Sequence, residues 1–363
     1  MINKRYLPPT IVETFLKQLP KGSTVKTIGY SVQKRPISLV SIGNGKTKIL
    51  LWSQMHGNES TTTKALFDFI PWFLDSSQQA YQKKFTLNII LQLNPDGAAV
   101  YTRLNAVSVD LNRDALKMSQ PESKALQNVY NRFKPDYCLN LHGQRTLFSA
   151  GVMGEPASIS LLSPSADINR TLTPARISAM KCIVAIFKGL ENDLPNQIGR
   201  YDDTFNPNCV GDHFTSLGTP TILFEAGHFS GDYQREATRA LILKSFKIFF
   251  NTLLVDENLH NVNEYVNIPE NSKDFVDLLV KGVNIIDKET LFKSQHLGVR
   301  YEEKLINGEI CFIPLAVIYG NKIKFKAHRT ITLPNALKDV PVVFEVDKSI
   351  QIKEFDELFS VIL

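Results

Sequence analysis

Apolar residues along the first 255 positions follow two patterns, one typical of strands and one typical of helices. Short runs rich in β-branched and aliphatic residues predict strands over 24–30, 37–42, 48–52, 87–93, 137–141 and 221–224. Apolar residues spaced three or four apart predict helices that begin at Thr10 and span 59–74, 122–133, 177–190 and 234–254. Strands that alternate with helices indicate an α/β fold.

Two details refine this pattern. Thr10 and Glu13 match the T-x-x-E capping box, in which both side chains bond free amides at a helix N-terminus, and Pro20 and Gly22 are expected to end that helix. The run 48–52 is apolar from Ile49 to Trp52, which predicts a central strand buried on both faces.

The pattern changes after about residue 261. A short helical patch is expected over 275–280, followed by alternating, β-branched segments over 310–318, 322–333 and 340–346. We therefore expect two domains, a catalytic α/β domain over 1–262 and a small β-rich domain over 263–363.

Composition narrows the classes of function. The 363 residues are 43% hydrophobic and 21% charged, as in folded globular proteins. The net charge of +5, without a basic cluster, argues against a nucleic-acid partner. The longest apolar stretches, 49–52 and 248–255, are shorter than the roughly 18 to 20 residues that span a bilayer. Basic N-terminal residues are followed by two prolines and not by an apolar signal segment, so we expect a cytoplasmic location.

Three residues near predicted strand ends suggest a metal site. His56 and Glu59 follow the strand over 48–52, and His142 ends the strand over 137–141. Strand ends are where α/β sheets bind ligands. Three protein ligands that leave a fourth position for water are typical of catalytic zinc, and no cysteine is spaced to complete a structural site. Taken singly, Glu59 is also explained as a helix first-turn residue and His142 as an ordinary structural histidine.

Further candidates for chemistry lie elsewhere in the chain. Glu225 ends an apolar strand, where a carboxylate is costly to bury without a partner. It is either a solvated strand end or a general base for metal-bound water. Arg103, Asn112 and Arg113 lie in a polar stretch that begins with an Asn-Pro-Asp-Gly turn. Arginines beside a metal suit a substrate carboxylate and a developing oxyanion.

Taken in order, these residues resemble the zinc carboxypeptidases, peptidase family M14. That family has H-x-x-E, N-P-D-G, an arginine, D-x-N-R, a later histidine and a late glutamate in the same order. The matching residues here are His56 with Glu59, Asn94 to Gly97, Arg103, Asp110 with Asn112 and Arg113, His142, and Glu225. The resemblance covers roughly 37–240 and leaves the C-terminal hundred residues unexplained.

The resemblance implies a zinc-carboxypeptidase-like mixed sheet flanked by helices, and a zinc metallopeptidase. One zinc ion per chain is bound by His56, Glu59 and His142 in this assignment. Glu225 would deprotonate the zinc-bound water and Arg103 would polarise the scissile carbonyl. Asn112 and Arg113 would hold the free carboxylate of the substrate. Asp110 would accept a hydrogen bond from His56.

The chain departs from the digestive carboxypeptidases in one respect, because it lacks a tyrosine about twenty residues before Glu225. Tyr201, Tyr233 and His213 are candidates for its role. The related succinylglutamate desuccinylases and aspartoacylases share several motifs and a β-rich C-terminal domain. The substrate is therefore either a peptide, including the cell-wall type, or an N-acyl amino acid, in both cases with a free carboxylate. The N-P-D-G turn favours the peptidase; the oligomeric state is left open.

Overall fold

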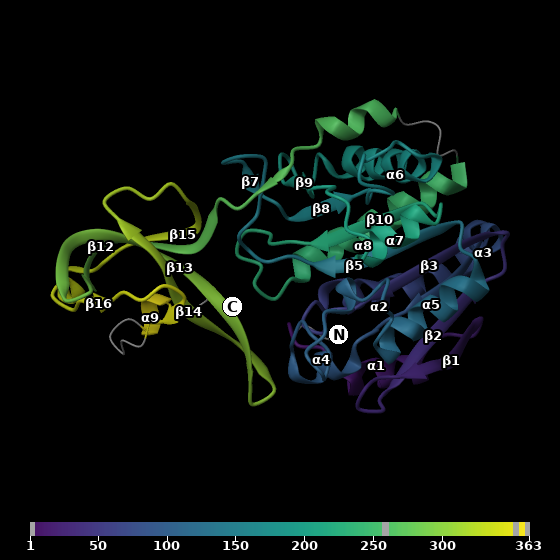
Figure 1. Ribbon diagram of the computed structural model, residues 1–363, viewed down its shortest axis with the longest axis horizontal. Coiled ribbons are helices and arrows are strands. Elements are labelled where there is room, and N and C mark those ends of the chain that lie inside the picture. Colours follow the sequence, from purple (N-terminus) through teal and green to yellow (C-terminus); the bar gives the residue numbers. More distant parts are fainter. Residues whose placement is uncertain (1–3, 256–260, 351–355, 360–363) are drawn as a thin grey trace.

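A computed structural model gives the fold of residues 4–255, 261–350 and 356–359. Two sheet regions follow each other along the chain, an α/β body and a β-rich C-terminal region (Figure 1). The outer ends of the two expected domains lie outside the described residues. The proposed boundary between 262 and 263 falls at the start of η4 (Val262–Asn267).

The body contains an eight-stranded mixed sheet of order β1-β2-β4-β3-β5-β10-β8-β9. Its strands are β1 (Ser23–Tyr30), β2 (Pro36–Gly43), β3 (Thr47–Ser53), β4 (Phe85–Ile90), β5 (Tyr137–Gly143), β8 (Ile159–Leu162), β9 (Ile198–Arg200) and β10 (Thr221–Ala226). The central strands β4, β3, β5 and β10 are mutually parallel, and β2 and β8 flank them antiparallel. The carboxyl ends of the four central strands therefore meet at one edge.

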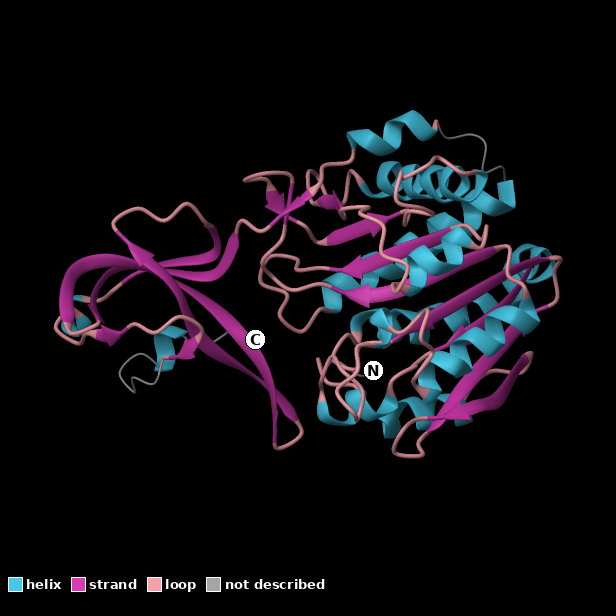
Figure 2. Cartoon of the chain, viewed as in Figure 1, coloured by secondary structure: helices cyan, strands magenta, loops and turns pink. Residues whose placement is uncertain are grey.

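Helices cover both faces of this sheet, which confirms the α/β class (Figure 2). The α-helices of the body are α1 (Pro9–Lys17), α2 (Thr61–Leu74), α3 (Gln79–Lys84), α4 (Pro95–Val100), α5 (Pro121–Phe133), α6 (Pro174–Leu190), α7 (Val210–Ser216) and α8 (Glu236–Val255). Short 3₁₀ helices are η1 (Ser76–Gln78) and η2 (Leu111–Arg113).

The central strand β3 shows why the run 49–52 is apolar. Ile49 and Leu51 join the core beneath α2, α6 and α8, whereas Leu50 and Trp52 join the core beneath α5 and α7. Successive side chains of a strand point to opposite faces, so a strand covered on both faces needs an apolar residue at every position. The predicted central strand is confirmed.

The C-terminal region is a six-stranded sheet with its own apolar core. Its strands are β12 (Phe275–Asp287), β13 (Thr290–Ile306), β14 (Glu309–Gly320), β15 (Lys326–Thr332), β16 (Val342–Val343) and β17 (Lys348–Ser349), with η5 (Asn335–Leu337) and α9 (Asp356–Phe359) nearby. A small sheet of β6 (Ser149–Ala150), β7 (Glu155–Pro156) and β11 (Asn271–Ser272) links the two regions. The long β13–β14 hairpin points back toward the body (Figure 1).

The expected helix over 275–280 is wrong, because these residues begin strand β12. Five of the six are buried, since β13 and β15 pair with β12 on its two edges. A short continuous apolar run does not distinguish a buried strand from a helix by periodicity. The sequence also gave no expectation of β13, whose exposed part is largely polar.

The capping box at Thr10 and Glu13 is also wrong. Helix α1 begins at Pro9 with Pro8 at the N-cap, and no side chain caps it. Proline suits the first helical position because the amide it lacks would be unpaired there. The turn at 94–97 instead starts helix α4, where the Asn94 side chain accepts a hydrogen bond from the Gly97 amide.

In the described part of the chain, no helix is both long enough and apolar enough to span a bilayer.

Candidate active site

Three adjacent parallel strands position the candidate residues at the carboxyl edge of the sheet. His56 lies in the turn after β3, His142 is the next-to-last residue of β5, and Glu225 lies near the end of β10. In the parallel register of β5 and β10, Glu225 lies directly beside His142. The sheet thus brings together residues that are up to 169 positions apart in sequence, counting from His56 to Glu225.

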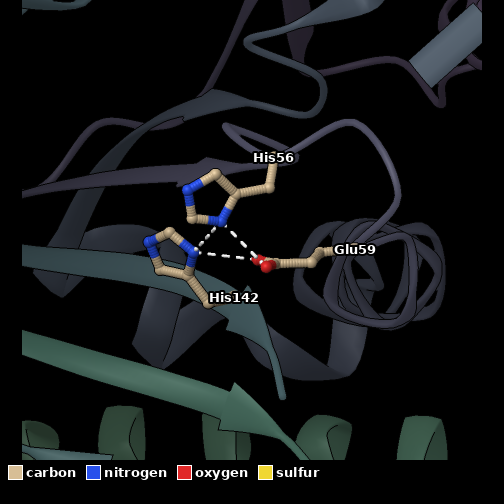
Figure 3. Close-up of side chains that lie close together, drawn as sticks. All are labelled: His56, Glu59 and His142. Atoms are coloured by element: carbon tan, nitrogen blue, oxygen red, sulfur yellow. Dashed lines mark hydrogen bonds and ion pairs between the residues drawn. The ribbon is translucent and has the colours of Figure 1, made fainter. Parts of the chain in front are cut away.

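His56, Glu59 and His142 converge on one point (Figure 3). Glu59 Oε1 lies 2.8 Å from His56 Nδ1, Glu59 Oε2 lies 2.9 Å from His142 Nδ1, and the two Nδ1 atoms are 3.1 Å apart. One ligand atom from each residue lies within 4.8 Å of the others. Two imidazole nitrogens and a carboxylate are a donor set that zinc accepts, and three protein ligands leave a position for water. The set therefore fits the zinc ion expected from the sequence.

Neighbouring groups hold these ligands in place. Glu59 Oε2 also accepts a hydrogen bond from the Gly143 amide, at 3.0 Å. Burial lowers the pKa of His56, but the negative charge of Glu59 and the hydrogen bond to Asp110 outweigh burial and raise that pKa above its ordinary value. Burial lowers the pKa of His142. Burial opposes ionisation of Glu59, yet the two histidines hold the pKa of its carboxyl well below the usual range.

Asp110 lies beside His56 and Arg103. Its Oδ1 is 3.1 Å from His56 Nε2, the ring nitrogen that faces away from Glu59. Its Oδ2 accepts a hydrogen bond from Arg103 Nε, also at 3.1 Å. A carboxylate on the far nitrogen leaves Nδ1 of His56 free of a proton and fixes the ring toward the metal position.

Asp110→Asn is therefore expected to weaken zinc binding by about 10- to 100-fold, the usual cost of losing such a partner. Competition with a zinc-binding indicator measures the affinity. Asp193, which pairs with Lys244 on the surface, offers a matched control in Asp193→Asn. Equal zinc affinity in the two variants would remove Asp110 from the support of the metal site.

Glu225 carries the features of a general base. Its Oε2 atom is buried and has no hydrogen-bond partner among the described residues. Burial and the negative charge of Glu59 raise the pKa of Glu225 well above its ordinary value. An unpaired carboxylate with a raised pKa beside a metal site is suited to accept a proton from water.

The three other candidates differ in position. Arg103 lies beside the metal ligands, with Nη1 3.2 Å from His56 Nδ1 and 3.4 Å from Glu59 Oε1. Arg113 is exposed and contacts the Cys209 sulfur at 3.1 Å. Asn112 uses its side-chain oxygen to accept a hydrogen bond from the Val210 amide, at 2.9 Å. Of these three residues, only Arg103 lines the cavity that opens beside the metal ligands.

A cavity of about 630 Å³ opens from the metal ligands toward the C-terminal sheet. Glu59, Arg103 and Glu225 line it from the body, whereas Arg300 and Phe312 line it from the C-terminal sheet. No motif marks Arg300 or Phe312, so the sequence does not single out these two residues.

The three candidates for the role of the missing tyrosine lie in different places. Tyr201 and Tyr233 line the cavity, whereas His213 lines a small pocket elsewhere. The Tyr233 hydroxyl is engaged, because it donates to Asp277 Oδ1 at 2.9 Å. Burial and the charges of Glu225 and Glu59 raise the pKa of Tyr201 far above its usual range. The charge of Glu225 thus acts on Tyr201, whereas Tyr233 is bound to Asp277.

Comparison of the sequence with known proteins identifies relatives over part of the chain. Residues 10–167 match the family model described as zinc carboxypeptidase, Peptidase_M14. Carboxypeptidase SOL1 of Arabidopsis thaliana is 28% identical over 153 residues, which cover 36% of this chain and 31% of that protein. Carboxypeptidase 2 of Trichophyton tonsurans is 24% identical over 99 residues, which cover 26% of this chain and 18% of that protein. The match thus spans less than a third of each relative.

Solved structures show the same fold over more of the chain. A metallo-carboxypeptidase from Burkholderia cenocepacia superimposes with a TM-score of 0.54 at 16% identity, over 69% of this chain and 71% of that one. A metallo-carboxypeptidase from Pseudomonas aeruginosa, in complex with (2-guanidinoethylmercapto)succinic acid, gives a TM-score of 0.54 at 18% identity, over 70% and 71%. Residues 10–167 are thus similar to the zinc carboxypeptidases of the Peptidase_M14 family, and the chain shares the fold of solved metallo-carboxypeptidases.

Proposed function

We propose that the protein is a zinc-dependent metallocarboxypeptidase that hydrolyses the C-terminal amide bond of a peptide. The observation that carries this proposal is the convergence of the His56, Glu59 and His142 ligand atoms beside an unpaired Glu225. A structural metal site would have no use for a buried carboxylate without a partner, because such a group is costly to keep. The location in the cytoplasm and the absence of a nucleic-acid partner stay predictions of the sequence.

The metal, when bound, would supply Lewis acidity for the carbonyl and lower the pKa of water. The remaining chemistry belongs to residues of this chain. Glu225 Oε2 would accept the proton of the attacking water and pass it to the leaving amine. The Arg103 guanidinium, exposed at the cavity wall, would donate to the oxygen on which negative charge develops. Asp110 holds both Arg103 and His56 in position.

Asn112 and Arg113 are proposed to hold the free α-carboxylate of the substrate. They do not line the cavity. Both lie in η2, within one turn of Asp110. Asp110 in turn contacts His56 and Arg103. The Arg113 side chain now donates to the Asn112 carbonyl, at 2.7 Å, and contacts Cys209. These are exchangeable partners, so a substrate carboxylate would replace them with a charged pair.

Amidation of the substrate's C-terminus is therefore expected to abolish cleavage, and Arg113→Ala to cost about 2 to 5 kcal/mol of transition-state stabilisation. The kcat/KM of matched free and amidated peptides measures both effects. Arg132→Ala, on the surface of α5, is the control because it removes a guanidinium far from the site. Equal rates on amidated and free peptides would disprove the role of Arg113.

The second candidate is a zinc-dependent deacylase of N-acyl amino acids. It is favoured by one observation, namely that the C-terminal sheet forms part of the cavity wall. We propose that residues 263–363 form a domain that caps the site and limits the size of the acyl group. A screen of tripeptides against N-acetyl and N-succinyl amino acids separates the two candidates. Turnover of the N-acyl amino acids alone would assign the protein to the deacylases.

A further inference from the structure

Two arginines from different parts of the fold line the same cavity. Arg145 follows β5, three residues after the metal ligand His142, and Arg300 lies in β13 of the C-terminal sheet. They are more than 150 residues apart in sequence, so only the docking of the C-terminal sheet brings them to one cavity.

Neither guanidinium has a partner among the residues that the structure describes. Within 4–255, 261–350 and 356–359, neither side chain forms a hydrogen bond or an ion pair, and the Nε atom of Arg300 is buried. The charge of Arg145 adds to burial in lowering the pKa of Arg300, while Asp347 and Asp277 act in the opposite direction. Two unpaired like charges at one cavity are unfavourable unless an anion binds them.

Several other charged groups on the cavity wall already have partners. Arg5 Nη2 donates to Glu303 Oε1 at 2.9 Å, and the Tyr101 hydroxyl donates to the same carboxylate. Asp277 accepts hydrogen bonds from the Thr146 and Tyr233 hydroxyls and the Tyr301 amide. Asp347 also lines the cavity but makes no ion pair with Arg300 among the described contacts. Apart from Arg103, which is assigned to the scissile carbonyl, the positive charge available to a ligand lies at Arg145 and Arg300.

We propose that Arg145 and Arg300 together bind a carboxylate of the substrate on the acyl side of the scissile bond, so that the enzyme prefers substrates with an acidic group there. This inference rests on the proposed hydrolytic function. We assign this carboxylate to the acyl side because Asn112 and Arg113, which are assigned to the leaving amino acid, do not line the cavity. Arg145 and Arg300 do line it.

A carboxylate fits the site better than a phosphate. Asp277, Glu303 and Asp347 share the cavity wall, and they repel a dianionic phosphate more strongly than a singly charged carboxylate. Two guanidinium groups offer planar donors that match the two oxygens of a carboxylate.

Matched substrates test the preference. Blocked peptides with a free C-terminus would be made in pairs, with Glu or Gln immediately before the scissile bond, over several C-terminal residues. We expect the parent to favour Glu by about 10-fold in kcat/KM, mostly through KM, and Arg145→Gln and Arg300→Gln each to reduce that preference several-fold. Lys281→Gln removes an exposed charge from the same sheet outside the cavity and should keep the parent's preference. An equal rate on both members, or a preference that survives in the double variant, would overturn the proposal.

A binding measurement separates this proposal from the proposed function. Glutarate, a dicarboxylate, is expected to raise the melting temperature of the parent and of Lys281→Gln, but much less that of the Arg145→Gln/Arg300→Gln double variant. If no peptide is cleaved while this pattern holds, the peptidase function is wrong and the carboxylate site stands. An equal shift of the melting temperature in the double variant would place glutarate elsewhere, such as on the metal. A larger shift with inorganic phosphate than with glutarate would contradict the carboxylate assignment.

Discussion

His142→Ala is expected to abolish stable zinc binding and, with it, hydrolytic activity. His142 supplies one of three converging ligand atoms, and its imidazole lies 2.9 Å from Glu59 and 3.1 Å from His56. The loss of a direct ligand should exceed the about 10- to 100-fold cost of losing an outer partner such as Asp110. Metal analysis after dialysis against a weak chelator, with an affinity titration, measures the effect.

His213→Ala is the control for this variant. His213 is half-buried in α7 and lines a pocket outside the cavity, so its removal should leave one zinc ion per chain. Because His142→Ala removes a buried side chain, the more conservative His142→Gln is tested beside it. A melting curve of each variant shows whether the fold is kept. Zinc bound by both folded variants as tightly as by the parent would show that His142 is not a ligand.

Glu225→Gln is expected to lower kcat by about 10² to 10⁴, the range that a positioned general acid or base contributes. The amide has nearly the same volume and does not accept the water proton, so the fold and the zinc content should be retained. The carboxylate has no partner to lose, because its Oε2 atom is unpaired among the described residues. Steady-state kinetics on a free peptide, with metal analysis of the same preparation, measure the change.

Glu264→Gln, in η4 on the surface, is the matched control and should keep the parent's kcat. A Glu225→Gln variant with full zinc content and a kcat within a few-fold of the parent would exclude Glu225 as the proton acceptor. Loss of zinc in this variant would instead indicate a role of Glu225 in the metal site.

The central strands of the body could be predicted from local sequence, whereas β8, β9 and β13 could not. The run 49–52 of β3 is apolar at every position because both faces of the strand are covered there, and the polar residues that follow it begin at the sheet edge. The order of His56, Glu59, His142 and Glu225 was informative for the same reason, since parallel strands place their carboxyl ends at one edge. Predictions failed where local patterns are ambiguous, as in 275–280, where only pairing with β13 and β15 selects a strand.

The sequence by itself determined the α/β class, the metal ligands as candidates and the family resemblance, because each depends on residues whose spacing is fixed by short elements. Only the tertiary structure decided what surrounds the site. The unpaired Glu225 oxygen, the hydrogen bond that Asp110 accepts from His56, and the shared cavity of Arg145 and Arg300 depend on packing between distant segments. Such contacts leave no periodic signal in the chain, since the energy of burial and charge pairing is set by neighbours in space and not by neighbours in sequence.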